Sequence, residues 1–136
     1  MTLTFAGAGI VGGSLADGNH ELAIAADKVL TEYSLLDGDE DGIAGGDYRF
    51  GAAAAADRFF RFFGDSNGDR LVNTTDLALF RTALGKREGQ AGYLAYFDYD
   101  ADRDVDTAVD YAEFLIRYRQ RYLWPAGGRP TIAVVR

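Results

Sequence analysis

One stretch of the chain, residues 65–76, constrains the fold more than any other. It reads Asp-Ser-Asn-Gly-Asp-Arg-Leu-Val-Asn-Thr-Thr-Asp, with oxygen-bearing side chains at positions 1, 3, 5, 9 and 12 and a backbone carbonyl available at position 7. A hard cation such as Ca²⁺ takes about six to eight oxygen ligands, and alternating ligands in a tight loop surround one point. The stretch therefore predicts a calcium-binding loop with the ligands Asp65, Asn67, Asp69, Leu71, Asn73 and Asp76.

The flanks of this loop favour helices. Residues 52–63 have high helix propensity and end at Gly64, and residues 77–84 show helical apolar spacing and end at Gly85. Helix, loop and helix in this order are the plan of an EF-hand, in which Val72 would form a short β-bridge to a partner loop. The alternative is a solvated turn rich in Asp and Asn between two helices.

A second copy of the pattern follows at residues 98–110 and is one residue longer before its closing carboxylate. So many carboxylates in one loop repel one another unless a cation is bound. Asp110 can close this loop if residues 107–109 bulge; otherwise the site loses its last ligand and weakens. The predicted ligands are Asp98, Asp100, Asp102, Asp104, Asp106 and Asp110.

Both loops carry arginine at position 6, where glycine normally makes the sharp turn. Arg70 and Arg103 are expected to adopt a left-handed backbone, which costs roughly 1–2 kcal/mol for a residue with a side chain. The positive charge also opposes a bound cation. We therefore expect modest calcium affinity rather than that of a tight cytosolic buffer.

A third acidic stretch precedes these loops. Asp37, Asp39 and Asp41 share the 1-3-5 spacing, and Gly42 stands at position 6. Position 12 is Tyr48, so this stretch has no closing ligand of the EF-hand type. A surface turn rich in Gly and Asp and a third calcium site of another type both remain open.

Composition narrows the classes of partner. The 136 residues carry a formal net charge of −7 with a pI near 4.6. This balance argues against nucleic acid and anionic membranes and favours cations or basic partners. The chain has no cysteine, which excludes disulfides and thiolate metal sites. No window approaches the roughly 18 apolar residues of a membrane span, and the first residues lack the features of a signal peptide.

Catalysis is not indicated by any constellation of residues. The single histidine, His20, is expected at the surface in a turn or strand start, without an evident catalytic partner. The carboxylates are spaced for a spherical cation, and only their abundance would support a glycosidase. A calcium sensor would need a groove rich in methionine, and Met1 is the only one. We expect a protein that is not an enzyme.

The predicted fold class is α+β. Short strands in residues 1–50, forming a partial immunoglobulin-like sandwich, precede a paired EF-hand domain over residues 51–124 and a tail over residues 125–136. Strands are expected near residues 2–5, 20–24 and 47–50, while residues 23–36 fit a strand or a helix. A final helix over about residues 110–122 carries an aromatic stripe expected to pack on phenylalanines 59–63. Its arginines at 117, 119 and 121 lie off that stripe, and residues 131–135 form an edge strand or a disordered end.

Residues 65–84 and 98–117 resemble the two repeats of type I dockerin domains, which read Asp-x-Asn-x-Asp-Gly-x-Val-Asn-x-x-Asp followed by a short helix. Aspartate at the closing position, Asp76, is typical of that family. The whole chain resembles the C-terminal end of large planctomycete surface proteins, in which an immunoglobulin-like β repeat precedes such a pair.

The resemblance implies a secreted or cell-surface calcium-binding module with a structural or attachment role. An alternative implied function is an adaptor that binds a cohesin-like protein in a polysaccharide-degrading assembly. In that family, dockerins contact cohesins through helix positions just after the Val and Asn of the loop, a part that Thr74 and Thr75 would play here. The second copy, Thr107-Ala108, repeats this pair only in part.

Overall fold

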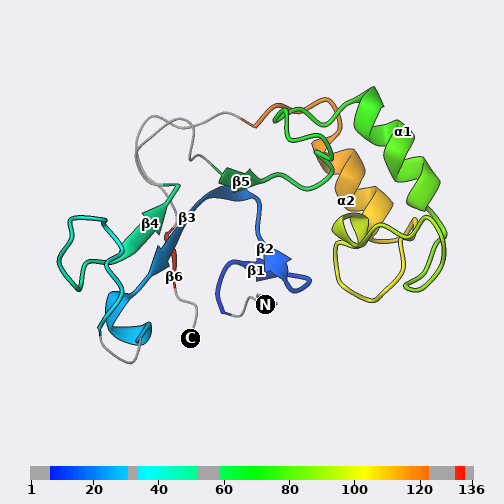
Figure 1. Cartoon of the computed structure of the whole chain (residues 1–136). Helices are drawn as coiled ribbons and strands as arrows, with labels where there is room; N and C mark the ends of the chain where they lie inside the picture. The colour runs from blue at the N-terminus through cyan, green and yellow to red at the C-terminus, as the bar shows by residue number, and fades with distance from the viewer. Residues whose placement is uncertain (1–6, 31–33, 52–58, 123–130, 134–136) are drawn as a thin grey trace. The chain divides into compact units, whose positions relative to one another are not determined.

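A computed structural model describes residues 7–30, 34–51, 59–122 and 131–133. The chain divides into two compact units, each discontinuous in sequence. The first unit combines Met1–Asp17 with Phe62–Trp124, and the second combines Gly18–Arg61 with Pro125–Arg136. The described residues contain two helices and small, mainly antiparallel sheets, which makes the class α+β, as predicted (Figure 1). None of their helices is long and apolar enough to cross a membrane.

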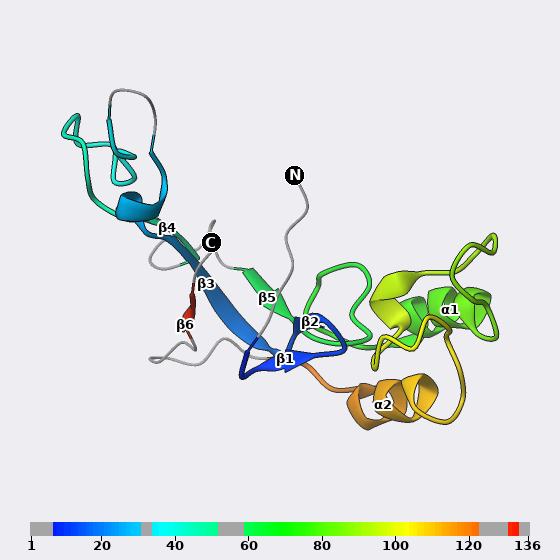
Figure 2. The same ribbon diagram turned by 90° about the horizontal axis from the view of Figure 1, so that it is seen from below.

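The second unit is organised around one strand, β3 (Gly18–Ile24), which pairs with three others (Figure 2). Its first half pairs antiparallel with β5 and its second half antiparallel with β4 and parallel with β6. A single turn of 3-10 helix, η1, follows β3. The bounds are β4 Tyr48–Phe50, β5 Phe59–Arg61, β6 Thr131–Ala133 and η1 Ala26–Lys28.

Two expectations for this unit are corrected. His20 is 2% exposed rather than at the surface, and it lies inside β3, in the half of the strand that pairs with β5. Residues 59–61 form a strand instead of the end of a helix, because their backbone groups pair with β3. A strand is confirmed at the start of residues 131–135. For residues 23–36, which fitted a strand or a helix, the described part holds the end of β3 and the short helical turn η1. The predicted strand at residues 2–5 and the helix at residues 52–58 lie outside the described residues.

The first unit holds both acidic loops and both α-helices. α1 (Thr74–Ala83) follows the first loop, and α2 (Asp110–Arg117) follows the second (Figure 1). A 3-10 turn, η3 (Ala95–Phe97), leads into the second loop. α2 is shorter than the predicted helix, because Tyr118 is extended and Arg119 adopts a φ of 66°.

A hairpin that the sequence analysis did not predict belongs to the same unit. β1 (Ile10–Val11) and β2 (Ser14–Leu15) pair across Gly12 and Gly13, whose φ values are 52° and 71°. Two-residue hairpin turns with positive φ at both positions strongly favour Gly-Gly, so this dipeptide was the available signal. The predicted division had left the hairpin in the 1–50 region.

The core of the first unit is aromatic. Phe80 from α1, Phe97 from η3 and Phe114 from α2 are completely buried, and the ring centroids of Phe80 and Phe114 lie 4.7 Å apart. Phe62 and Phe63 are buried in this unit as well, which agrees with the predicted aromatic core. Leu115, the residue after Phe114 on α2, lies off this core and is 48% exposed.

The two repeats hold each other by reciprocal backbone pairing. Val72 in the first loop exchanges hydrogen bonds with Arg119 and Gln120, which follow the second helix. Val105 in the second loop pairs in the same way with the residues after α1, at 85 and 86. The expected bridge from Val72 to a partner loop is thus corrected: each loop pairs with the segment that follows the other repeat's helix.

Candidate metal centre

The first loop folds around the carboxylate of Asp65. Its Oδ1 accepts the backbone N–H of Gly68 at 2.8 Å and of Asp69 at 3.2 Å, and its Oδ2 accepts that of Arg70 at 2.8 Å. Asp69 in turn accepts the N–H of Leu71 at 2.8 Å. These bonds turn the backbone tightly, so that alternate side chains of the loop gather on one side.

Asp76 closes the first loop from α1. Its Oδ1 accepts both the N–H and the hydroxyl of Ser66, at 2.9 and 2.8 Å, and its Oδ2 accepts the N–H of Asn73 at 2.9 Å. Asn73 accepts the N–H of Thr75 in return, which completes a capping box at the start of α1. The closing carboxylate is therefore buried and fixed at position 12 by contacts across the whole loop.

Asp110 occupies the corresponding place in the second loop. Its Oδ1 accepts the N–H of Tyr99 and its Oδ2 that of Asp106, both at 2.7 Å. These donors stand at positions 2 and 9, as Ser66 and Asn73 do in the first loop. The additional residue is absorbed in a turn at residues 107–109, and α2 consequently begins at Asp110.

Three carboxylates of the second loop converge. One oxygen each from Asp98, Asp100 and Asp102 lies within 4.8 Å of the other two. Asp98 is 8% exposed, and its Oδ2 accepts the hydroxyl of Tyr93 at 2.7 Å and the N–H of Arg103 at 2.9 Å. Its Oδ1 is buried, and no donor among the described residues reaches it. Such an oxygen is costly to leave without a partner, and a cation among the three carboxylates would supply one.

The electrostatics of the loops also favour a cation. Burial, together with the charges of Asp98 and Asp100, raises the pKa of Asp110 to about 6. Burial raises the pKa of Asp65 as well, with smaller contributions from the charges of Asp69 and Asp76. These carboxylates carry negative charge in poorly solvated positions, and a bound divalent cation would lower the free energy of their charged forms.

The two arginines at position 6 adopt the left-handed backbone predicted for them. Arg70 has a φ of 67° and Arg103 a φ of 76°. Their N–H groups reach the carboxylates of Asp65 and Asp98 at position 1. The turn is thus made in both loops without glycine, at the expected cost in backbone strain.

The other predicted ligands make different contacts with their neighbours. Asp69 accepts from the side chain of Asn67 at 3.1 Å, and Asn73 donates weakly to the carbonyl of Leu71 at 3.4 Å. The side chain of Asp104 forms an ion pair with Arg87 at 3.3 Å, which leaves its backbone carbonyl as the group offered at position 7. Asp106 accepts the N–H of Ala108 and Val109, and these contacts lower its pKa.

The third acidic stretch repeats part of this geometry. Oxygens of Asp37, Asp39 and Asp41 lie within 4.8 Å of one another, and Asp37 accepts the N–H of Asp41 and Gly42 as Asp65 does in the first loop. Position 12, Tyr48, is the first residue of β4 and offers no carboxylate. Both alternatives, a surface turn and a calcium site, remain open for this stretch.

Removing the strain at position 6 should stabilise the second loop. Arg103→Gly is expected to raise the free energy of unfolding by about 1 kcal/mol relative to Arg103→Ala, because both remove the side chain but only glycine adopts a positive φ without steric cost. Urea denaturation in excess calcium measures the difference. Equal stability of the two variants would contradict the strain argument.

The raised pKa of Asp110 predicts opposite effects of acid on the two forms of the protein. In the metal-free protein the folded pKa of Asp110, about 6, exceeds the ordinary pKa of an aspartate, 3.8, so protonation of this group favours folding and its contribution to stability grows as the pH falls between these values. Calcium binding requires the ionised carboxylate, so affinity at the second loop should fall as the pH drops below about 6. Calorimetric calcium titrations from about pH 7 to about pH 5 test this, and an affinity independent of pH would contradict it.

Residues 63–118 match the family model of the dockerin type I domain. No curated protein and no solved structure matches the chain. The matched segment begins just before the first loop and ends after α2, so it contains both acidic loops and both α-helices of the first unit. The resemblance inferred from the loop motifs is confirmed for this segment, and that family consists of binding modules without catalytic activity. Residues 63–118 are therefore similar to a dockerin type I domain, a family whose members bind calcium.

Proposed function

We propose that the first unit is a calcium-dependent docking module that folds around two Ca²⁺ ions and attaches its parent protein to a partner. The observation that carries the proposal is the buried Oδ1 of Asp98, which no donor in the described part of the chain reaches and which lies among converging carboxylates. The family match over residues 63–118 supports the same role.

In this proposal each ion joins the start of its loop to the helix that follows it. Position 1 supplies Asp65 or Asp98, and position 12 supplies Asp76 or Asp110 from the first turn of α1 or from the start of α2. Calcium supplies the positive charge that these carboxylates lack among themselves. The remaining ligands would be Asn67, Asp69, the Leu71 carbonyl and Asn73 in the first loop, and Asp100, Asp102, the Asp104 carbonyl and Asp106 in the second.

Calcium should contribute a large part of the stability of this unit. A ligand that binds only the folded state stabilises it by about 2.7 kcal/mol when its concentration is about 100-fold above Kd. The unit has no disulfide, and its helices are short: α1 has 10 residues and α2 has 8. Isolated helices of that length are only marginally stable in water, so we expect the metal and the aromatic core to stabilise them.

The docking role rests on the exposed start of α1. Thr74 and Thr75 are both exposed on its first turn, and Leu79 is 38% exposed one turn later. A cohesin-like protein is the partner class that the family match favours. In the second repeat, Thr107 and Ala108 are exposed in the turn before α2, which would offer a related but different surface. The acidic charge of the chain disfavours nucleic acid as a partner.

We place the module in an extracellular or surface protein, in which residues 18–61 would be the end of an immunoglobulin-like β repeat. The strands arranged around β3 support this assignment, because so few short strands do not bury two faces by themselves. The parent assembly would be structural or polysaccharide-degrading.

Calcium titration of chelator-stripped protein tests the metal sites. Two binding events by calorimetry, with a gain of helix by circular dichroism and much weaker binding of Mg²⁺, are expected. Asp98→Asn should abolish one event, whereas Asp27→Asn, which changes an exposed carboxylate of the second unit by the same charge, should leave both. An absence of heat and of spectral change at millimolar calcium (about 1 mM and above) would overturn the proposal.

Capture by an immobilised cohesin tests the docking role. Retention in calcium, loss in chelator and weaker retention of the Thr74→Ala/Thr75→Ala double variant are the expected results, because both side chains lie on the exposed surface of α1. Ser34→Ala, an exposed hydroxyl of the second unit, is the matched control. Retention that is the same in calcium and in chelator would contradict docking through this surface. Retention of the double threonine variant equal to that of the unaltered protein would also contradict it.

A further inference from the structure

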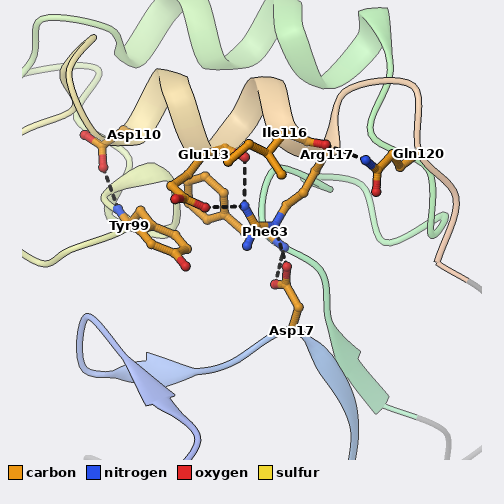
Figure 3. A network of polar contacts seen from close by, with 8 residues as sticks. All are labelled: Asp17, Phe63, Tyr99, Asp110, Glu113, Ile116, Arg117 and Gln120. Carbon is orange, nitrogen blue, oxygen red and sulfur yellow. Dashed lines mark hydrogen bonds and ion pairs between the residues drawn. The ribbon is translucent and has the colours of Figure 1, made fainter.

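The side chain of Arg117, at the end of α2, is 13% exposed and forms two ion pairs. One partner is Glu113 on the same helix, at 2.7 Å, and the other is Asp17, at the end of the N-terminal hairpin segment (Figure 3). The sequence analysis had placed Arg117 off the buried stripe of the helix. The structure corrects this, because the hairpin segment supplies a carboxylate from a distant part of the chain.

Asp17 joins the two repeats of the unit. Its Oδ1 accepts the N–H of Phe63 at 2.7 Å, just before the first loop, and its Oδ2 accepts from Nε of Arg117. Because one carboxylate holds both groups, the hairpin segment is fixed to the start of the first repeat and the end of the second. Asp17 is largely buried in this position, with a side chain that is 20% exposed.

From Arg117 the contacts continue into the second loop. Its guanidinium carbon lies 5.3 Å from the ring centroid of Tyr99, and the N–H of Tyr99 is the donor to the closing carboxylate of Asp110 (Figure 3). The hairpin turn also touches this residue: a Cβ on Gly12 would lie 2.1 Å from the Tyr99 carbonyl oxygen. Tyr99 is therefore held by the hairpin from its backbone and by Arg117 from its ring.

Within the described part of the chain, the first loop lacks a residue equivalent to Arg117. Counted from Phe80 and Phe114, the residue of α1 that corresponds to Arg117 is Ala83, which is completely buried. Position 2 of the first loop is Ser66, whose own hydroxyl adds a second hydrogen bond to Asp76. The first closing carboxylate is thus held from within its loop, and the second depends on a side chain that the hairpin segment fixes.

We propose that the hairpin segment, residues 7–17, is a strap that positions the second calcium loop, with Asp17 and Arg117 as positioning residues acting through Tyr99. Calcium at that loop and docking of the strap are thermodynamically coupled, so each strengthens the other. The first loop, whose closing carboxylate is held from within the loop, is coupled to the strap only through the N–H of Phe63 and is therefore affected less. The inference rests on the proposed binding of calcium at the second loop.

The test is a calcium titration of the full chain followed by amide NMR. The amides of Tyr99 and Ser66 report separately on the two loops, since each donates to the closing carboxylate of its own loop. Asp17→Asn should weaken calcium binding reported by Tyr99 about fivefold or more and weaken that reported by Ser66 clearly less. Asp17→Glu, which keeps the charge, should recover part of the loss, and Asp27→Asn controls for net charge.

A second pair of variants tests the strap without altering any charge. Gly12→Ala places a methyl group against the Tyr99 carbonyl, whereas Gly13→Ala meets no atom within 4 Å. Both positions have positive φ, so backbone strain is common to the two variants. Gly12→Ala should reproduce the selective loss at the second loop, and Gly13→Ala should not.

The possible outcomes distinguish a failure of the proposed second calcium site from a failure of the strap. If Tyr99 in the unaltered protein does not respond to calcium, the proposed second site fails and the coupling fails with it. If Tyr99 responds normally and Asp17→Asn or Gly12→Ala leaves its affinity unchanged, the strap alone is overturned. An equal loss at Ser66 and Tyr99 would indicate general destabilisation and would also overturn it.

Discussion

The rest of the first unit depends on one kind of interaction, a buried carboxylate that gathers backbone N–H groups from both ends of its own loop. Asp76 and Asp110 do this with the same pair of positions, although their loops differ in length. The arrangement brings negative charge together where solvation is poor, and burial raises the pKa of Asp110 accordingly. A divalent cation is the natural counterpart of such a cluster, so the stability of the fold and the binding of metal depend on the same atoms.

The two repeats are not independent modules placed in series. Each loop is completed by backbone from the end of the opposite repeat, through Val72 in one direction and Val105 in the other. The aromatic core is shared in the same way, since Phe80 contacts both Phe97 and Phe114. Loss of order in one repeat therefore removes strand pairing and core contacts from its partner, which favours cooperative folding of the pair.

The acidic loops could be predicted from the sequence because their chemistry is local: the spacing of Asp65 to Asp76 already specifies a turn around a cation. The left-handed backbone of Arg103 followed from the same reasoning. Features that depend on distant residues could not be predicted. Residues 59–61 pair with β3, His20 is buried within that strand, and Arg117 is paired with a carboxylate that lies far before it in the chain. Helical periodicity and propensity carry no information on such partners.

The contact between Asp17 and Phe63 also determines which fragments of the chain keep the contacts of the first unit. Residues 18–61 of the second unit lie, in sequence, between these two residues, so they interrupt the first unit instead of preceding it. A recombinant fragment limited to residues 63–118 would include Arg117 and Glu113 but not Asp17. In that fragment the guanidinium of Arg117 would lose one of its two carboxylate partners, and the backbone N–H of Phe63 would lose the carboxylate of Asp17. Fragments intended to reproduce the native module should therefore retain the N-terminal segment, or replace residues 18–61 with a short linker that rejoins it.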